Sequence, residues 1–219
     1  MEDQNNPDHL NSSMTDLMTS LMVIFILLLL VFVHRTAGKD AAVTDVLLKR
    51  LRHDMQPMGF NENTIRPDPR DRNAILVIVP DRLMNFEPSK FNLRPEGEQF
   101  LKNYIPNFAN VLCSDQFRSS IESIVVEGHT DTEPYAGHTA QESESLNLKL
   151  SQDRSMEVVR NALSDLSTME VERGCFLEKL SASGRGEQEQ EATPDESRRV
   201  ILKIRVKVVD AVPLRAVVQ

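Results

Sequence analysis

The sequence contains no tryptophan, and aromatic residues make up only 5% of its 219 positions. Proteins that bind single-stranded nucleic acids stack the bases on aromatic side chains, and this composition offers few such platforms. The net charge is -8, and lysine and arginine are not gathered into a basic patch of the kind that neutralises phosphates. We therefore expect no nucleic-acid partner.

Groups that carry catalysis or bind metals are also scarce. The chain has two cysteines and five histidines, and no second histidine or cysteine accompanies His129 at the spacing of a zinc site. No serine or cysteine stands with a base in a nucleophile motif. We expect no enzymatic activity, no metal and no cofactor, and we interpret His129 as a structural residue that closes a turn.

Charged residues are absent from one long apolar run, residues 17–33, in which only Thr19 and Ser20 are polar. As a helix these seventeen residues span roughly 25 Å, enough for the hydrocarbon core of a bilayer. We predict a transmembrane helix over residues 12–34 after a tail over residues 1–11. The run lacks the basic start of a secretory signal and a convincing cleavage site, so we interpret it as an uncleaved anchor.

A single carboxylate, Asp16, stands at the start of this run. On a helix it shares a narrow face with Thr19, Ser20 and Val23, at i+3, i+4 and i+7. Two interpretations are open. An acid in the first turn of a helix is stabilised by the helix dipole, whereas an ionisable side chain within a membrane helix usually marks an ion pathway.

The segment over residues 35–72 connects this helix to the rest of the chain. Its part over residues 41–52 carries apolar residues at helical spacing, including Val43, Leu47 and Leu51. We interpret this part either as an ordinary juxtamembrane helix or as a plug that blocks an ion path. The prolines and the glycine that follow predict an irregular linker.

A globular domain is predicted over residues 73–210, with a tail over residues 211–219. An uninterrupted apolar run suits a buried first strand, and alternating apolar and charged residues suit a half-exposed last one. The order β-α-β-α-β-β predicts a layered α/β (α+β) sandwich with helices on one face of the sheet. The expected elements are strands at 74–79, 121–127, 176–182 and 199–209 and helices at 95–112 and 147–166.

Four motifs follow one another within this domain. They are Glu127-Gly128-His129-Thr130-Asp131, Asn147-Leu148-Lys149-Leu150-Ser151-Gln152-Asp153-Arg154, Gly184-Arg185-Gly186-Glu187 and Arg198-Arg199-Val200. In this order they resemble the OmpA-like peptidoglycan-binding domain. The resemblance implies that Asp131 and Arg154 bind the zwitterionic diaminopimelate of the peptide stem, with Thr130, Asn147 and Leu150 beside them. One departure is Ser197, where the family usually has asparagine.

The chemistry of these residues fits such a ligand. A group that bears both an ammonium and a carboxylate needs an anion and a guanidinium close together. Arg154 can bind the carboxylate through two parallel hydrogen bonds, and Asp131 can accept from the ammonium. Asn147, Leu150 and Arg154 lie at i, i+3 and i+7, on one face of the predicted helix. The alternative is a simple salt bridge between Asp131 and Arg154.

The membrane segment has a resemblance of its own. The string from Thr15 to Phe25 is similar to the transmembrane helix of MotB-type stator subunits, and so is the Thr-Asp-x-x-Pro-Tyr-Ala string at residues 130–136 with its extended loop. The resemblance implies that Asp16 carries the transported proton and that Thr19 and Ser20 line the channel. It also implies a homodimer of this chain inside a ring of MotA-like subunits, which are ZorA-like in the anti-phage branch.

The same resemblance implies a single-pass protein of the bacterial inner membrane, embedded in the lipid bilayer with its N-terminus in the cytoplasm and its wall-binding domain in the periplasm. Basic residues after the span, such as Arg35 and Lys39, would place the domain in the cytoplasm by the positive-inside rule, and the motifs override this. The short chain without a basic tail resembles Zorya-type anti-phage stators more than flagellar ones. The alternatives are a flagellar stator and a passive wall anchor without ion flow.

The two cysteines form a candidate disulfide in an oxidising periplasm. In an OmpA-like sheet the second and third strands are parallel neighbours. Cys113 lies in the segment before the second predicted strand and Cys175 just before the third, so both enter the sheet from the same edge. The resemblance thus implies that the two residues are close enough to pair. The alternative is two separately buried thiols.

Overall fold

We describe the protein from a computed structural model. It describes residues 7–84, 86–87 and 89–207, without the side chains of residues 7–15 and 34–42. The chain divides into two compact units. The smaller one contains the chain up to Asp40, and the larger one, Ala41–Val208, is the globular domain.

The N-terminal helix α1, Pro7–Met55, contains the apolar run. Within it, Asp16–Val33 is long and apolar enough to cross a membrane, with a mean hydropathy of 2.7, and the side chains of this stretch are exposed. The predicted membrane helix and the predicted juxtamembrane helix therefore both lie within α1.

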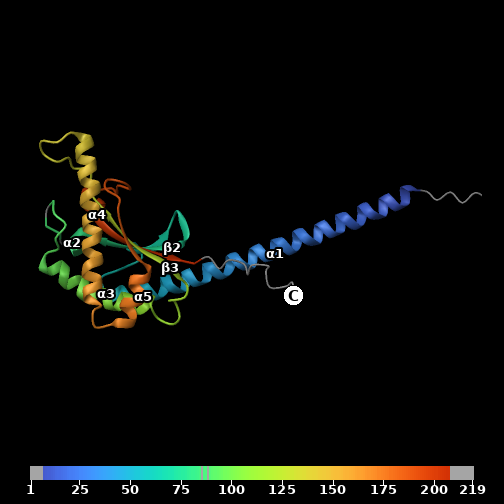
Figure 1. The fold of residues 1–219 in the computed structure, drawn as a ribbon, viewed down its shortest axis with the longest axis horizontal. Helices are drawn as coiled ribbons and strands as arrows, with labels where there is room; N and C mark the ends of the chain where they lie inside the picture. The colour runs from blue at the N-terminus through green and yellow to red at the C-terminus, as the bar shows by residue number, and fades with distance from the viewer. Residues whose placement is uncertain (1–6, 85, 88, 208–219) are drawn as a thin grey trace, which may run out of the picture. The chain divides into compact units, whose positions relative to one another are not determined.

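The globular domain is built on a sheet of five strands (Figure 1). The strands lie in the order β1-β2-β5-β3-β4, and all neighbours are antiparallel except the parallel pair of β3 and β4. Their bounds are β1 Ile65–Asp68, β2 Asp71–Pro80, β3 Ile121–His129, β4 Leu180–Gly184 and β5 Arg199–Val206. The predicted parallel neighbours are thus confirmed.

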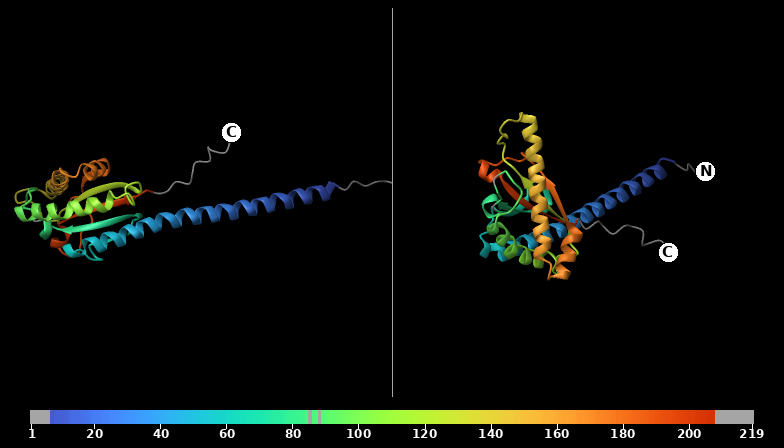
Figure 2. Two further views of the ribbon diagram at one scale, coloured as in Figure 1. Left: turned by 90° about the horizontal axis from the view of Figure 1, so that it is seen from below. Right: turned by 60° about the vertical axis from the view of Figure 1, so that its left-hand side comes forward.

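Helices connect and cover these strands (Figure 2). Their bounds are η1 Gln56–Met58, α2 Asp81–Met84, α3 Pro95–Leu112, α4 Ala140–Asp165, α5 Glu170–Lys179 and α6 Pro194–Ser197. Pro95 stands in the first turn of α3, where its missing N–H has no intrahelical partner to lose. The predicted mixed α/β fold with its layer of helices is confirmed.

Apolar and polar side chains alternate along the strands, and this alternation gives the sheet one apolar face. Val77, Leu202 and Val126 are register partners on three adjacent strands, and all are buried. They belong to one hydrophobic cluster with residues of α3, α4, α5 and the last turns of α1. The opposite face carries charged side chains, among which Lys203 pairs with Asp68 at 2.5 Å. The period-two pattern of the sequence therefore separates core from solvent.

The domain begins earlier than the predicted residue 73. Leu47, Leu51 and Met55 of α1 have no exposed surface and join the core. The expected linker contains β1, in which Ile65 is buried and accepts a hydrogen bond from Arg52 Nε at 2.9 Å. The prolines of this segment led us to expect irregular structure. Pro67 is nevertheless tolerated in a strand, because β1 lies at the edge of the sheet.

Three further boundaries differ from the predictions. Phe176, expected to begin a strand, lies in α5, and β4 starts only at Leu180. A short apolar run cannot by itself distinguish a buried helix from a strand. The helix expected from residue 147 starts at Ala140, because Thr139 and Glu142 form a capping box. The last strand was expected to residue 209, and β5 ends at Val206; residues 208 and 209 lie outside the described residues.

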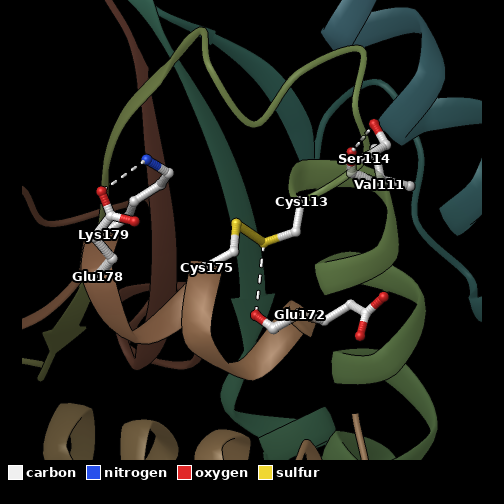
Figure 3. Close-up of a disulfide and its surroundings, with 7 residues drawn as sticks. All are labelled: Val111, Cys113, Ser114, Glu172, Cys175, Glu178 and Lys179. Atoms are coloured by element: carbon white, nitrogen blue, oxygen red, sulfur yellow. Dashed lines mark hydrogen bonds and ion pairs between the residues drawn. A yellow bond between two sulfur atoms is a disulfide. The ribbon is translucent and has the colours of Figure 1, made fainter. Parts of the chain in front are cut away.

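Cys113 and Cys175 are joined in a disulfide (Figure 3). Their Cα atoms are 6.0 Å apart, and both side chains are buried in the core cluster. Cys113 is the C-cap residue of α3, whereas Cys175 lies within α5 and not directly before β4. The disulfide therefore links the two helices that precede the parallel strands.

The disulfide closes a sequence separation of 62 residues. On the chain-entropy model this loop stabilises the fold by about 4 kcal/mol. We expect the Cys113→Ser, Cys175→Ser double variant to lose stability of that order, measured by denaturant unfolding of the detergent-solubilised chain. Mass spectrometry of chain extracted under alkylation without reductant should find neither thiol modified. Complete alkylation of both cysteines would contradict the pairing.

Candidate functional site

A cavity of about 700 Å³ opens where β3 ends and α4 passes the sheet. All five residues predicted to bind the peptide stem line it: they are Thr130, Asp131, Asn147, Leu150 and Arg154. The structure thus brings together residues from two separate motifs. Their role in binding stays a prediction.

Close packing of β3 against α4 positions these residues. A side chain at Gly128 would collide with the carbonyl oxygen of Ser151, so only glycine allows this approach. Ser151 Oγ in turn accepts a hydrogen bond from Gly186 N at 2.8 Å. The Gly184–Glu187 motif therefore holds the start of its loop against the helix that carries Arg154.

Asp131 is anchored on both carboxylate oxygens. Oδ1 accepts from Glu133 N at 3.2 Å, and Oδ2 accepts from Arg198 Nη1 at 2.5 Å. The salt bridge considered in the sequence analysis, between Asp131 and Arg154, is not the one that forms among the described residues. Arg198 was present in the fourth motif, but its role as the partner of Asp131 was missed, since only the fold brings them together.

Arg154 is buried, with 5% of its surface exposed. Its Nε donates to the carbonyl oxygen of Lys90 at 3.0 Å, and its guanidinium carbon lies 4.8 Å from the centre of the Phe86 ring. No carboxylate of the described residues forms an ion pair with it. Burial lowers the pKa of Arg154, and the charge of Asp81 opposes this effect. The guanidinium is therefore held in place with capacity left for an anionic ligand.

The remaining cavity residues have different surroundings. Asn147 Nδ2 donates to Glu187 Oε1 at 2.9 Å and to the carbonyl oxygen of Glu133 at 3.3 Å, so it ties two loops together. The buried Thr130 Oγ1 has no hydrogen-bond partner among the described residues. Sequence reasoning also missed Tyr135 and Phe86 as aromatic walls of the cavity. Burial raises the pKa of Tyr135, and the charges of Arg154 and Asp131 both act on it.

The predicted membrane residues lie together on α1. Thr19 Oγ1 and Ser20 Oγ both donate to the backbone carbonyl oxygen of Asp16, at 2.9 and 2.8 Å. These are local bonds of the kind that serine and threonine make one helical turn back. The Asp16 side chain is exposed on the helix surface. The structure thus places all three residues on one face.

Comparison with known proteins places the cavity in a family. The model of the OmpA family matches residues 85–201, which is more than half of the chain. The chain belongs to the OmpA family. All four motifs fall inside the matched region, while β1, β2 and the end of α1 lie before it.

This OmpA-family chain is similar to a curated protein and to a solved structure. It is 23% identical over 207 residues to the Zorya protein ZorB of Escherichia coli, covering 88% of this chain and 86% of that one. A putative MotB-like protein from Desulfovibrio vulgaris has a similar fold, with a TM-score of 0.56 and 19% identity. That match covers 78% of this chain and 98% of the D. vulgaris chain.

His129 is enclosed next to the cavity of the OmpA-family domain. Its side chain has no exposed surface, its Nδ1 lies 3.1 Å from the carbonyl oxygen of Gln188, and Nε2 is buried without a hydrogen-bond partner. Among the described residues no group of three or more potential ligands gathers around a metal site. Burial, together with the charge of Arg199, lowers the pKa of His129 to about 4.

This depressed pKa predicts acid sensitivity. Since His129 titrates near 6.5 when unfolded and at about 4 when folded, its stabilising contribution is complete above pH 6.5. It is lost as the pH falls towards 4, by about 3 kcal/mol in total. Denaturant unfolding from pH 7 to pH 4 should show a smaller loss for His129→Gln than for the wild type. An equal loss of unfolding free energy between pH 7 and pH 4 in the two proteins would contradict this assignment.

Proposed function

We propose that this chain anchors a membrane complex to peptidoglycan by holding a zwitterionic group of the peptide stem in the cavity. The observation that carries this proposal is the buried Arg154, which has no carboxylate partner among the described residues and lines the same cavity as Asp131. A buried guanidinium is suited to bidentate binding of a carboxylate. Asp131 accepts from the ammonium, and diaminopimelate, implied by the family resemblance, carries both groups.

The rest of the chain supports an ion-driven role for the complex. A stretch able to cross a membrane precedes the wall-binding domain, and Asp16 stands at its start beside two hydroxyl groups. We propose that Asp16 carries protons, and that Thr19 and Ser20 line the path. Two copies of the chain pair inside a ring of MotA-like subunits in the inner membrane, with the N-terminus in the cytoplasm and the domain in the periplasm.

Similarity to ZorB over most of both chains favours a Zorya-type anti-phage stator over a flagellar one. In such a unit the wall-bound domain keeps the stator stationary, so that ion flow does mechanical work on another component. A passive wall anchor is the second candidate. It would need the cavity but not a carboxylate at the start of its membrane helix, because ionisable groups there are costly.

Loss of the Arg154 guanidinium should abolish wall binding. Arg154→Ala leaves the ligand carboxylate unpaired, and Asp131→Asn does the same to the ammonium, which costs about 2–5 kcal/mol, or about thirtyfold or more in affinity. The measurement is sedimentation of the detergent-solubilised full chain with peptidoglycan sacculi. Arg160→Ala is the matched control, since Arg160 lies on the same helix with 68% of its side chain exposed. Equal sedimentation of Arg154→Ala and wild type would refute the assignment.

The ion-carrier role predicts a separate phenotype. Asp16→Asn keeps the size of the side chain but cannot bind and release a proton at physiological pH, so protection against phage, or motility, should be lost while expression and wall binding persist. Asp45→Asn serves as a control, because Asp45 is an exposed carboxylate on α1 outside the apolar run. Full activity of Asp16→Asn in cells that carry the partner subunits would leave the passive anchor as the better proposal.

A further inference from the structure

A further carboxylate, Asp81, lines the cavity from the end of β2, which lies at the same edge of the sheet as the end of β3, on the other side of β5. It follows directly after β2, where Pro80 is the register partner of Arg199 on β5. Its backbone N–H donates to the carbonyl oxygen of Arg198 at 3.1 Å. Sheet pairing therefore fixes Asp81 beside Arg198, and its side chain remains 26% exposed.

Asp81 shares Arg198 with Asp131. Arg198 Nε lies 3.8 Å from Asp81 Oδ2, while Nη1 donates to Asp131 Oδ2 at 2.5 Å. A third carboxylate, Asp195, pairs with the same guanidinium from the solvent side, with 87% of its side chain exposed. One arginine thus bridges two cavity carboxylates and one at the surface.

Asp81 is also the charge that acts most strongly on Arg154, although the two do not form an ion pair among the described residues. Burial raises the pKa of Asp81 against the opposing charges of Arg154 and Arg198. Both side chains line the cavity without forming an ion pair with each other, so both are available to a ligand bound there.

The charges of these four side chains sum to zero when all are ionised: Asp81 and Asp131 carry one negative charge each, and Arg154 and Arg198 one positive charge each. Glu133 lines the cavity as well and adds one negative charge. A zwitterionic ligand group leaves this balance unchanged and meets one partner of each sign. A carboxylate without an ammonium brings an uncompensated negative charge next to two anions, where like charges repel.

We propose that Asp81 is a specificity-determining residue, which makes the cavity prefer a ligand bearing both an ammonium and a carboxylate over one bearing carboxylates alone. The inference rests on the proposed wall binding. Asparagine at position 81 removes one negative charge from the cavity, and Arg198 is left to Asp131 alone on the cavity side. Zwitterion binding then weakens, while binding of a simple carboxylate strengthens.

The test uses two soluble probes with the same carbon chain. Meso-diaminopimelic acid has both ammonium groups, and pimelic acid has neither. Each competes with sacculi for the detergent-solubilised full chain, and the ratio of the two inhibitory concentrations is the selectivity. We expect Asp81→Asn to reduce this ratio about tenfold, equivalent to about 1.4 kcal/mol, with the two inhibitory concentrations moving in opposite directions.

Two variants make the test specific. Asp195→Asn removes the other partner of Arg198 and should leave the ratio unchanged, and Asp81→Glu keeps the charge and should retain most of the selectivity. Asp81→Ser replaces Asp81→Asn if thermal unfolding shows that the latter is not folded. An unchanged ratio in a folded charge-free variant, or an equal shift for both probes, overturns this inference alone. Failure of diaminopimelic acid to displace wild-type chain from sacculi overturns the proposed wall binding as well.

Discussion

Burial of the Arg154 guanidinium is the constraint around which the cavity is arranged. Removing such a group from water is expensive unless other groups replace its hydration. Here the ring of Phe86 and the carbonyl oxygen of Lys90 replace part of it, and the charge of Asp81 opposes the effect of burial on the pKa. None of these three lies on α4. The end of β2 and the loop before α3 must therefore be in place before Arg154 can point into the cavity.

The carboxylate of Asp131, on the other side of the cavity chemistry, is also held by neighbouring groups. Asp131 is fixed by a backbone N–H and by Arg198, so its carboxylate is oriented before any ligand arrives. Pre-orientation reduces the entropy lost on binding. The close approach of Gly128 to α4 sets the spacing between Asp131 and Arg154, because a larger residue would push the strand and the helix apart. The packing of β3 against α4 and the spacing of the two charged side chains thus depend on the same contact.

Local patterns predicted the elements whose signals lie within a few residues. Pro95 marks the start of α3, and alternation along residues 199–206 marks β5. The five cavity residues were found by their motifs. By contrast, the partner of Asp131 lies 67 residues away, and the contribution of Asp81 arises only when β2 and β5 pair. Such contacts leave no periodic trace in the sequence. The capping box of Thr139 and Glu142, however, is a local signal, from which the start of α4 can be predicted.

Burial in the globular domain also bears on the segment over residues 41–52, interpreted either as an ordinary helix or as a plug. Leu47, Leu48 and Leu51 of this segment are buried and pack in the core of the domain. Exposing three such side chains costs roughly 5–9 kcal/mol, at about 1.5–3 kcal/mol each. That is comparable to the whole stability of a typical domain. A plug that released this face would therefore need an equally large apolar surface elsewhere to cover it, and this burial favours the interpretation of an ordinary helix, packed on the globular domain.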